Sequence, residues 1–237
     1  MSGQAYLQAV SALLAELQAT QLESVRQVGE VIGRSVADGG IVHLFGSGHS
    51  HMAAEEVFVR AGTLTTVRAI WPEQITDKLE RVEGLGTSIL KMGDVRPGEV
   101  LFVISNSGIN PMPVDVALEA RQHGAVTVAV TSTQHSLAVP SRHSSGRRLM
   151  DVCDYLLDTR VPAGDVLLTV PGLGYPIGPA STVASVSLIQ AAMAEAVHWL
   201  VANGHEPPVR ISRNMPGGDA HNDRLGQRYR DRIPELG

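Results

Sequence analysis

The sequence is poor in cysteine, in lysine and in aromatic residues. Cys153 is the only cysteine among 237 residues, so no disulfide can form within the chain and a reducing compartment is the natural setting. The N-terminus shows no basic segment followed by an apolar core, and no stretch approaches the roughly 18 apolar residues of a membrane helix. We therefore expect a cytoplasmic protein that does not enter membranes.

Nearly all of the positive charge comes from arginine. Lys78 and Lys91 are the only lysines, and the net charge is −5. A chain with this balance has no general electrostatic attraction for nucleic acid or for anionic membrane surfaces. Any phosphate group that it binds must be held by local polar groups.

What the chain has in quantity is the material for a buried core. Hydrophobic residues make up 43% and charged residues 18%, and the length suits one α/β domain of about 200–250 residues. Apolar residues at helical spacing predict a long helix over about 4–36 and another over 179–202. Residues from about 203 to 237 are polar without apolar periodicity, which predicts a solvated C-terminal arm on a single domain spanning 1–237.

Between these helices, short apolar runs alternate with helical patterns. The predicted strands are 41–45, 66–70, 100–104, 125–130 and 154–158. Continuous apolar strands separated by helices favour an α/β fold with a five-stranded parallel sheet and helices on both faces. We expect the flavodoxin-like order 2-1-3-4-5, in which strands 1 and 3 are neighbours and a ligand crevice opens at their carboxyl ends.

Two polar loops follow these two strands. Loop 1 is Gly46-Ser47-Gly48-His49-Ser50, and loop 2 is Ser105-Asn106-Ser107-Gly108. Each leads from a strand into a helix whose first turn presents unpaired N–H groups and the positive end of the helix dipole, so a phosphate fits there without a lysine. Loop 3, residues 131–136, follows the fourth strand and either adds hydroxyl groups to the same crevice or is an ordinary Ser/Thr-rich turn.

These three loops, each following a strand of one α/β unit, resemble those of the sugar isomerase (SIS) domain over roughly residues 1–200. Residues 46–62 together with the ending 216–222 look like a group of stand-alone bacterial SIS proteins, and phosphoheptose isomerases are more distant relatives. The resemblance implies phosphosugar binding, with Ser50, Ser105, Ser107 and Asn110 as phosphate ligands. The full set of candidate phosphate-binding residues is Gly48, His49, Ser50, Ser105, Asn106, Ser107, Asn110, Thr131 and Ser136. The alternative is that Ser and Asn simply cap two helices.

Aldose–ketose isomerisation needs a base that moves a proton between adjacent carbons. The helix after loop 1 carries His51 and Glu55 along one edge and Glu56 and Arg60 along the other. Glu55 or Glu56 is the candidate base with His51 assisting, although Glu56 with Arg60 equally fits an ordinary helix salt bridge.

SIS sites are often completed by a neighbouring subunit, so the resemblance also makes His221 of the C-terminal arm a candidate catalytic residue. The two long apolar helices predict a homodimer or homotetramer.

A metal site has weaker support. His51 and Glu55 could bind zinc, and Gln190 and His198 are similar to the Gln and His metal ligands of phosphoheptose isomerases. In those enzymes the helix His and Glu lie farther beyond the loop serine, and His198 could simply pack beside Trp199. We expect neither a metal nor another cofactor.

Three other functions compete with a sugar-phosphate isomerase. A dinucleotide-binding dehydrogenase needs a third glycine where His51 stands and an acidic residue after the second strand. A serine hydrolase with Ser50 as nucleophile needs a small residue where Met52 stands. A non-catalytic phosphosugar sensor keeps the serine ligands and needs no base, so it remains the alternative.

Overall fold

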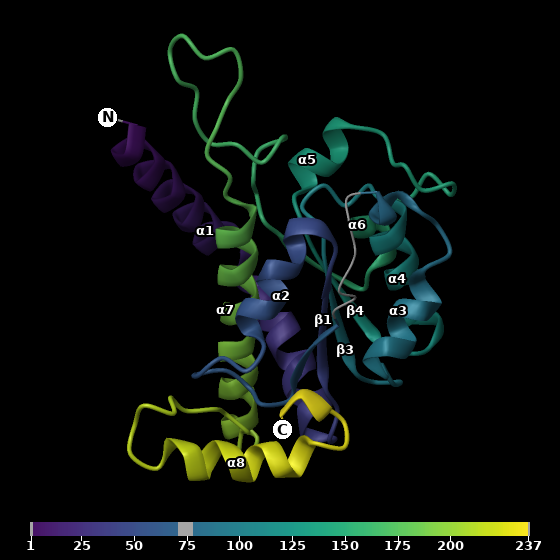
Figure 1. Cartoon of the computed structure of the whole chain (residues 1–237), viewed down its shortest axis with the longest axis vertical. Helices are drawn as coiled ribbons and strands as arrows, with labels where there is room; N and C mark the ends of the chain where they lie inside the picture. The colour runs from purple at the N-terminus through teal and green to yellow at the C-terminus, as the bar shows by residue number, and fades with distance from the viewer. Residues whose placement is uncertain (1, 71–77, 237) are drawn as a thin grey trace.

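Five short strands form one parallel sheet in the order β2-β1-β3-β4-β5 (Figure 1). The computed structural model describes residues 2–70 and 78–236. The strands are β1 (Val42–Gly46), β2 (Val67–Ile70), β3 (Val100–Ile104), β4 (Val126–Thr131) and β5 (Tyr155–Asp158). All neighbouring pairs are parallel, which confirms the predicted sheet and its strand order.

Helices cover both faces of the sheet, as predicted. Leu44, Phe102 and Val128 pack on one face against α1 (Ser2–Ala37), α2 (His51–Val57) and α7 (Ser181–Ala202). Leu101 and Val103 pack on the other face against α3 (Gly86–Gly93), α4 (Pro111–Gln122) and α6 (Leu149–Val152). Because the inner strands are buried on both faces, β3 is a continuous apolar run, and the only polar residues of β1 and β4 are the buried His43, Thr127 and Thr131.

The two long helices α1 and α7 lie side by side (Figure 1). By length and composition alone, α7 is long and apolar enough to cross a membrane. This differs from the prediction that no stretch of the chain approaches a membrane helix. Its residues Ala184, Leu188, Ala192 and Ala196 are buried in the same core as α1 and the sheet. This packing accounts for its apolar sequence as that of a core helix.

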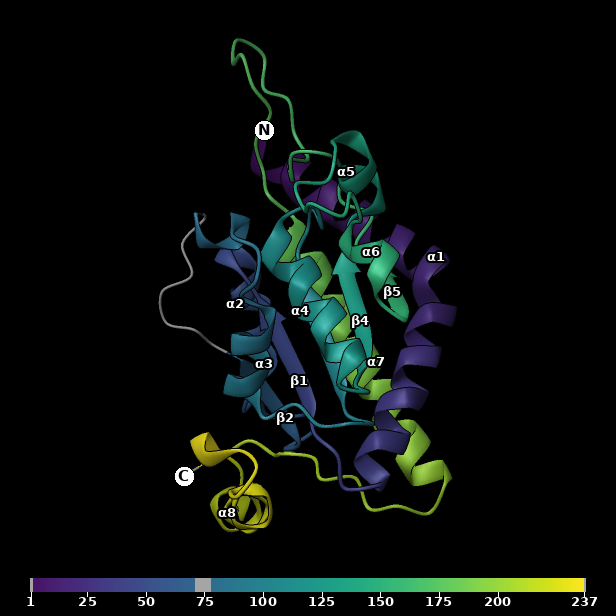
Figure 2. The same ribbon diagram turned by 90° about the vertical axis from the view of Figure 1, so that its right-hand side faces the viewer.

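The C-terminal arm is more ordered than the sequence predicts. It contains α8 (Gly218–Tyr229) and the short turn η3 (Pro234–Leu236), which lie at the amino ends of the strands (Figures 1 and 2). Asn222 is buried and bonds both the N–H and the C=O of Ile211, at 3.1 and 2.7 Å. A few polar anchors of this kind hold α8, so no apolar period marks it in the sequence.

Candidate functional site

Loop 1 leaves β1 beside the point where loop 2 leaves β3. Gly46 and Ile104 are register partners, so the two loops begin next to each other at the carboxyl edge of the sheet. Loop 1 then turns sharply back through η1 (Gly48–Ser50) into α2. A Cβ on Gly46 would lie 2.5 Å from the backbone oxygen of Ser50, so only glycine permits this turn.

Loop 2 is held from behind by loop 3. The Ser105 hydroxyl accepts the backbone N–H of Gly108 at 3.3 Å, and Gly108 has a φ of 60°. Thr131 donates its hydroxyl to the backbone oxygen of Asn106 at 3.2 Å, and Thr159 donates to the Asn106 side-chain oxygen at 3.2 Å. The threonines thereby fix the path of loop 2.

The predicted phosphate-binding residues fall into two groups by exposure. Thr131 and Ser136 are fully buried, so in this structure neither hydroxyl is presented at the surface of the loops. The Ser136 hydroxyl is buried without a hydrogen-bond partner in the part of the chain that the structure describes. The remaining candidates lie at or near the surface of the two loops, and of these His49 is exposed, Gly48, Ser50, Asn106 and Ser107 are half-buried, and Ser105 and Asn110 are mostly buried. Their role as phosphate ligands stays a prediction.

The start of α4 offers fewer N–H donors than predicted. Pro111 and Pro113 occupy its first turn and have no N–H group. Asn110 is the N-cap residue, but its side chain makes no capping hydrogen bond. An anion at loop 2 would therefore depend mainly on hydroxyl and side-chain amide groups.

The side chain of Asn110 instead joins loop 2 to a residue that the sequence analysis missed. Its Nδ2 donates to Glu80 Oε1 at 2.6 Å, and Ser47 of loop 1 donates its hydroxyl to Glu80 Oε2 at 3.0 Å. Arg142 donates from Nη1 to Asn110 Oδ1 at 2.7 Å. Glu80 and Arg142 are therefore at the candidate site, with a carboxylate bridging the two loops and a guanidinium beside it.

Glu80 is in η2 (Leu79–Arg81), and the segment around this turn is fastened on two sides. The Asp115 side chain on α4 accepts the backbone N–H of Gly84 at 2.6 Å, and Glu83 accepts the backbone N–H of Ser144. The hydrogen bond from Ser144 lowers the pKa of Glu83. One signal in the sequence could have found Glu80, because any segment after β2 starts from the same carboxyl edge of the sheet as loops 1 and 2.

Of the predicted catalytic residues on α2, only His51 contacts loop 1 in the described structure. His51 Nδ1 donates to the backbone oxygen of Gly48. Glu56 pairs with Arg60 at 3.2 Å and both side chains are well exposed, but α2 ends at Val57, so Arg60 lies beyond the helix that was predicted to carry both residues. Glu55 lines a separate groove with Phe58, Arg68, Ala69, Ile70, Met92 and Glu235.

The remaining candidates lie away from the loops of this chain. His221 donates from Nε2 to the backbone oxygen of Val209 at 2.8 Å, at the α8 end of the molecule, so any role in a neighbour's crevice stays a prediction. His198 is exposed rather than packed beside Trp199, whose ring stacks on His205. Within residues 2–70 and 78–236, no group of three or more His, Cys, Asp or Glu side chains is placed to hold a metal ion.

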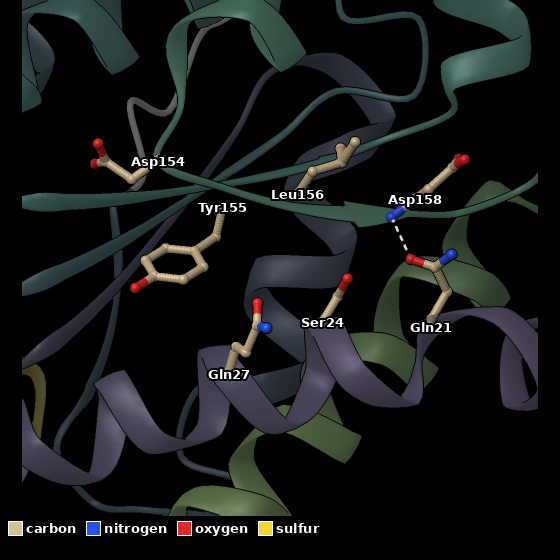
Figure 3. Close-up of a pocket in the computed structure, with 7 residues that line it drawn as sticks. All are labelled: Gln21, Ser24, Gln27, Asp154, Tyr155, Leu156 and Asp158. Atoms are coloured by element: carbon tan, nitrogen blue, oxygen red, sulfur yellow. Dashed lines mark hydrogen bonds between the residues drawn. The ribbon is translucent and has the colours of Figure 1, made fainter.

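A second groove runs along the outer edge of β5. It is lined by Gln21, Ser24, Gln27, Asp154, Tyr155, Leu156 and Asp158 (Figure 3). Tyr155 points toward α1, whereas the carboxylate of Asp158 points away from the groove (Figure 3). Gln21 accepts the backbone N–H of Asp158 at 3.0 Å, which shields the edge of the sheet from pairing with another strand.

Comparison with known proteins agrees with this architecture. The SIS domain family matches residues 5–132, and a UPF0309 protein of Geobacillus kaustophilus is 39% identical over 98% of this chain and 95% of its own length. The chain belongs to the SIS domain family. The resemblance predicted from the loops is thus confirmed.

Solved structures of this SIS fold include enzymes and regulators. Phosphoheptose isomerase from Neisseria gonorrhoeae matches with a TM-score of 0.54 and 18% identity, over 81% of this chain and 95% of that one. The sugar isomerase domain of an RpiR transcription factor from Sphaerobacter thermophilus gives 0.53 and 20%, over 86% and 97%. The Vibrio vulnificus NanR protein complexed with ManNAc-6P gives 0.55 and 13%, over 97% and 69%. At these identities the likeness establishes the fold and leaves the activity to the site.

Proposed function

We propose that this SIS protein binds a phosphorylated sugar at loops 1 and 2 and isomerises it between aldose and ketose forms. The observation that carries the proposal is the shared origin of the two loops at the carboxyl ends of β1 and β3, where parallel α/β sheets bind ligands. Ser50 and Ser107 are half-buried there, one on each loop. The NanR protein, which has the same fold, was solved with a sugar phosphate.

In this proposal the phosphate is held by Ser50, Ser105, Ser107 and Asn110. Arg142 adds the positive charge that the sequence analysis did not find, because its guanidinium already contacts Asn110. A guanidinium suits phosphate because it presents several N–H donors in a fixed plane. Local charge of this kind lets a chain of net charge −5 bind an anion.

The isomerase assignment is supported by the likeness to phosphoheptose isomerase. Moving a proton between adjacent carbons is acid–base chemistry, so the proposal invokes no metal and no organic cofactor. We place the reaction in the cytoplasm, in keeping with the single cysteine.

A non-catalytic sensor of sugar phosphates is the second candidate. The likeness to the sugar isomerase domain of a transcription factor favours it. A sensor would use the same phosphate ligands and would need no base.

The two functions are separated by measuring binding and proton exchange on the same samples. We expect hexose, amino-sugar or heptose phosphates to raise the melting temperature, and one of them to take up deuterium at carbon from solvent. The double variant Ser50→Ala/Ser107→Ala should bind that ligand at least roughly 100-fold more weakly, because each lost hydrogen bond to a charged group contributes about 1.5–3 kcal/mol and two are lost.

A matched control is Ser11→Ala/Ser88→Ala, which removes two exposed hydroxyls on α1 and α3 and should leave binding unchanged. If sugar phosphates bind tightly but none of them takes up deuterium at carbon, the sensor function replaces the isomerase function. Equal affinity of the loop variant and the wild type would exclude this phosphate site.

A further inference from the structure

Glu80 is the carboxylate that bridges the two loops of the site. Its two oxygens accept from Ser47 of loop 1 and from Asn110 at the end of loop 2, at 3.0 and 2.6 Å. The side chain is half-buried, and it comes from η2, an element that contributes no residue to the predicted phosphate ligands. We propose that Glu80 is the base that transfers the proton in the reaction proposed above.

The carboxylate is held in one orientation by a chain of contacts. Arg142 donates to Asn110 Oδ1, which leaves the amide nitrogen of Asn110 directed at Glu80. The hydroxyl of Ser47 fixes the second carboxylate oxygen. A base whose position is set before the substrate arrives loses little entropy and little reorganisation energy in the reaction.

The charges of the site divide the ligand between two regions. A phosphate dianion is repelled by the carboxylate of Glu80 and attracted by the guanidinium of Arg142, and Asn110 lies between these two groups with its nitrogen on Glu80 and its oxygen on Arg142. In the proposed pose the phosphate is on the serine hydroxyls and on the Arg142 side of Asn110, and the uncharged sugar carbons are next to Glu80. This is the arrangement that proton transfer at carbon requires, with the anion anchored at one end and the base at the other.

Neither carboxylate of α2 has this setting. Glu56 is engaged by Arg60, and Glu55 lies in a groove whose other walls include Arg68 and Glu235. Glu235 belongs to η3 at the amino ends of the strands, so this groove extends away from the carboxyl edge where loops 1 and 2 lie. Of the glutamates in the described ranges, Glu80 is the one recorded with hydrogen bonds to both loop 1 and the end of loop 2.

The proposed step is balanced among the substrate, Glu80 and one water molecule. The ionised carboxylate takes the proton from C2 of the open-chain aldose, and the C–H electron pair forms the C1=C2 bond of an enediol. The carbonyl electron pair moves to O1, which takes a proton from the water and leaves hydroxide. The C1=C2 electron pair then takes the proton back from Glu80 at C1, while the hydroxide removes the proton of O2, whose electron pair forms the ketone C=O bond. No net oxidant or reductant is consumed.

The test compares Glu80→Gln with Glu55→Gln and Glu56→Gln in the full chain. For a sugar phosphate that the wild type isomerises, we expect Glu80→Gln to lower kcat by roughly 100–10,000-fold, the usual contribution of a general base. Its dissociation constant for the same sugar phosphate should not rise, because the phosphate ligands remain and the repulsion by the carboxylate is removed. Titration of inorganic phosphate into the wild type and into Glu80→Gln measures the affinity of the anion site independently of turnover.

Each other result overturns the assignment. If Glu80→Gln isomerises normally and binds phosphate more tightly, the carboxylate only occupies the anion site of the empty protein. If Glu55→Gln or Glu56→Gln abolishes exchange while Glu80→Gln does not, the base is on α2. Because the inference rests on the proposed function, a wild type that binds sugar phosphate without exchange overturns the base and leaves the phosphate site standing, whereas a wild type that binds none removes both.

Discussion

His43 of β1 and Glu99, just before β3, are buried partners at the amino end of the sheet. His43 Nε2 donates to Glu99 Oε2 at 2.8 Å, and the ring is 0% exposed. Burial lowers the pKa of His43, although the hydrogen bond and charge of Glu99 oppose this. His43 Nδ1 is buried without a hydrogen-bond partner in the ranges described, so a protonated ring would hold an unsatisfied N–H there. Both observations favour the neutral form of the ring in the folded protein.

The first residue-scale consequence is loss of stability in mild acid. The unfolded chain protonates His43 near pH 6.5 but the folded chain does so only at lower pH, so the unfolded state binds more protons as pH falls below about 6.5. The free energy of unfolding in urea should fall between pH 7 and pH 5, by at most about 1.4 kcal/mol per pH unit for this group.

The variant His43→Gln should reduce this slope, since its amide can still donate to Glu99 but does not titrate. The exposed His198→Gln is the control and should keep the wild-type slope. An unchanged slope in His43→Gln would show that another group titrates. Arg232 also donates to Glu99, at 2.8 Å.

At the scale of elements, the contact between α1 and α7 depends on two glycines. Gly29 lies against Glu195, and a Cβ on Gly33 would lie 2.6 Å from the ring of Trp199. Both positions are buried within a helix, where glycine is otherwise unfavourable. Their small size lets the two helices approach closely.

This arrangement predicts opposite effects for two glycine-to-alanine changes in one helix. Gly33→Ala should lower the free energy of unfolding by roughly 1–3 kcal/mol, because the methyl group forces Trp199 or the helix to move. Gly3→Ala has open space around it and should be neutral or slightly stabilising. Urea unfolding of both variants measures the difference, and equal effects would mean that α7 does not press on Gly33.

At the scale of the whole molecule, apolar side chains remain exposed on the free end of α1. Leu7 is 66% exposed and Leu14 is 37% exposed, and the N-terminal end of this helix projects beyond the sheet (Figure 1). Apolar residues two helical turns apart share one face. An uncovered face of this kind is typical of a contact between protein chains.

We therefore expect a homodimer or homotetramer at micromolar concentration, measured by light scattering. Leu7→Gln/Leu14→Gln should shift the protein toward a smaller species, because the shared face becomes polar. Val201→Gln, at the far end of α7 and 60% exposed, is the control. A strictly monomeric wild type would contradict this expectation and would also remove the shared role of His221.

The strands and the two loops could be predicted because their signals are local. Val100 to Ile104 are apolar in unbroken succession, which only a strand buried on both faces explains at this length. Gly46 and Gly108 stand where the backbone turns sharply, Gly46 because the backbone of Ser50 four residues later lies against it and Gly108 because its φ is positive. The family resemblance rested on the same local motifs.

What the sequence by itself determined was therefore the five strands, the two long helices and the order of the strands in the sheet. It also predicted that ligands bind at the carboxyl edge of the sheet. Only the tertiary structure brought Glu80 and Arg142 to Asn110, and it placed His221 and α8 at the opposite end of the strands. The contacts of Asn110 with Glu80 and Arg142 join residues 30 or more positions apart in the sequence. The contact of His221 with Val209 is shorter in sequence. The neighbours of a side chain in the sequence carry no information about such a long-range contact, because the path of the chain between the two partners decides whether it forms.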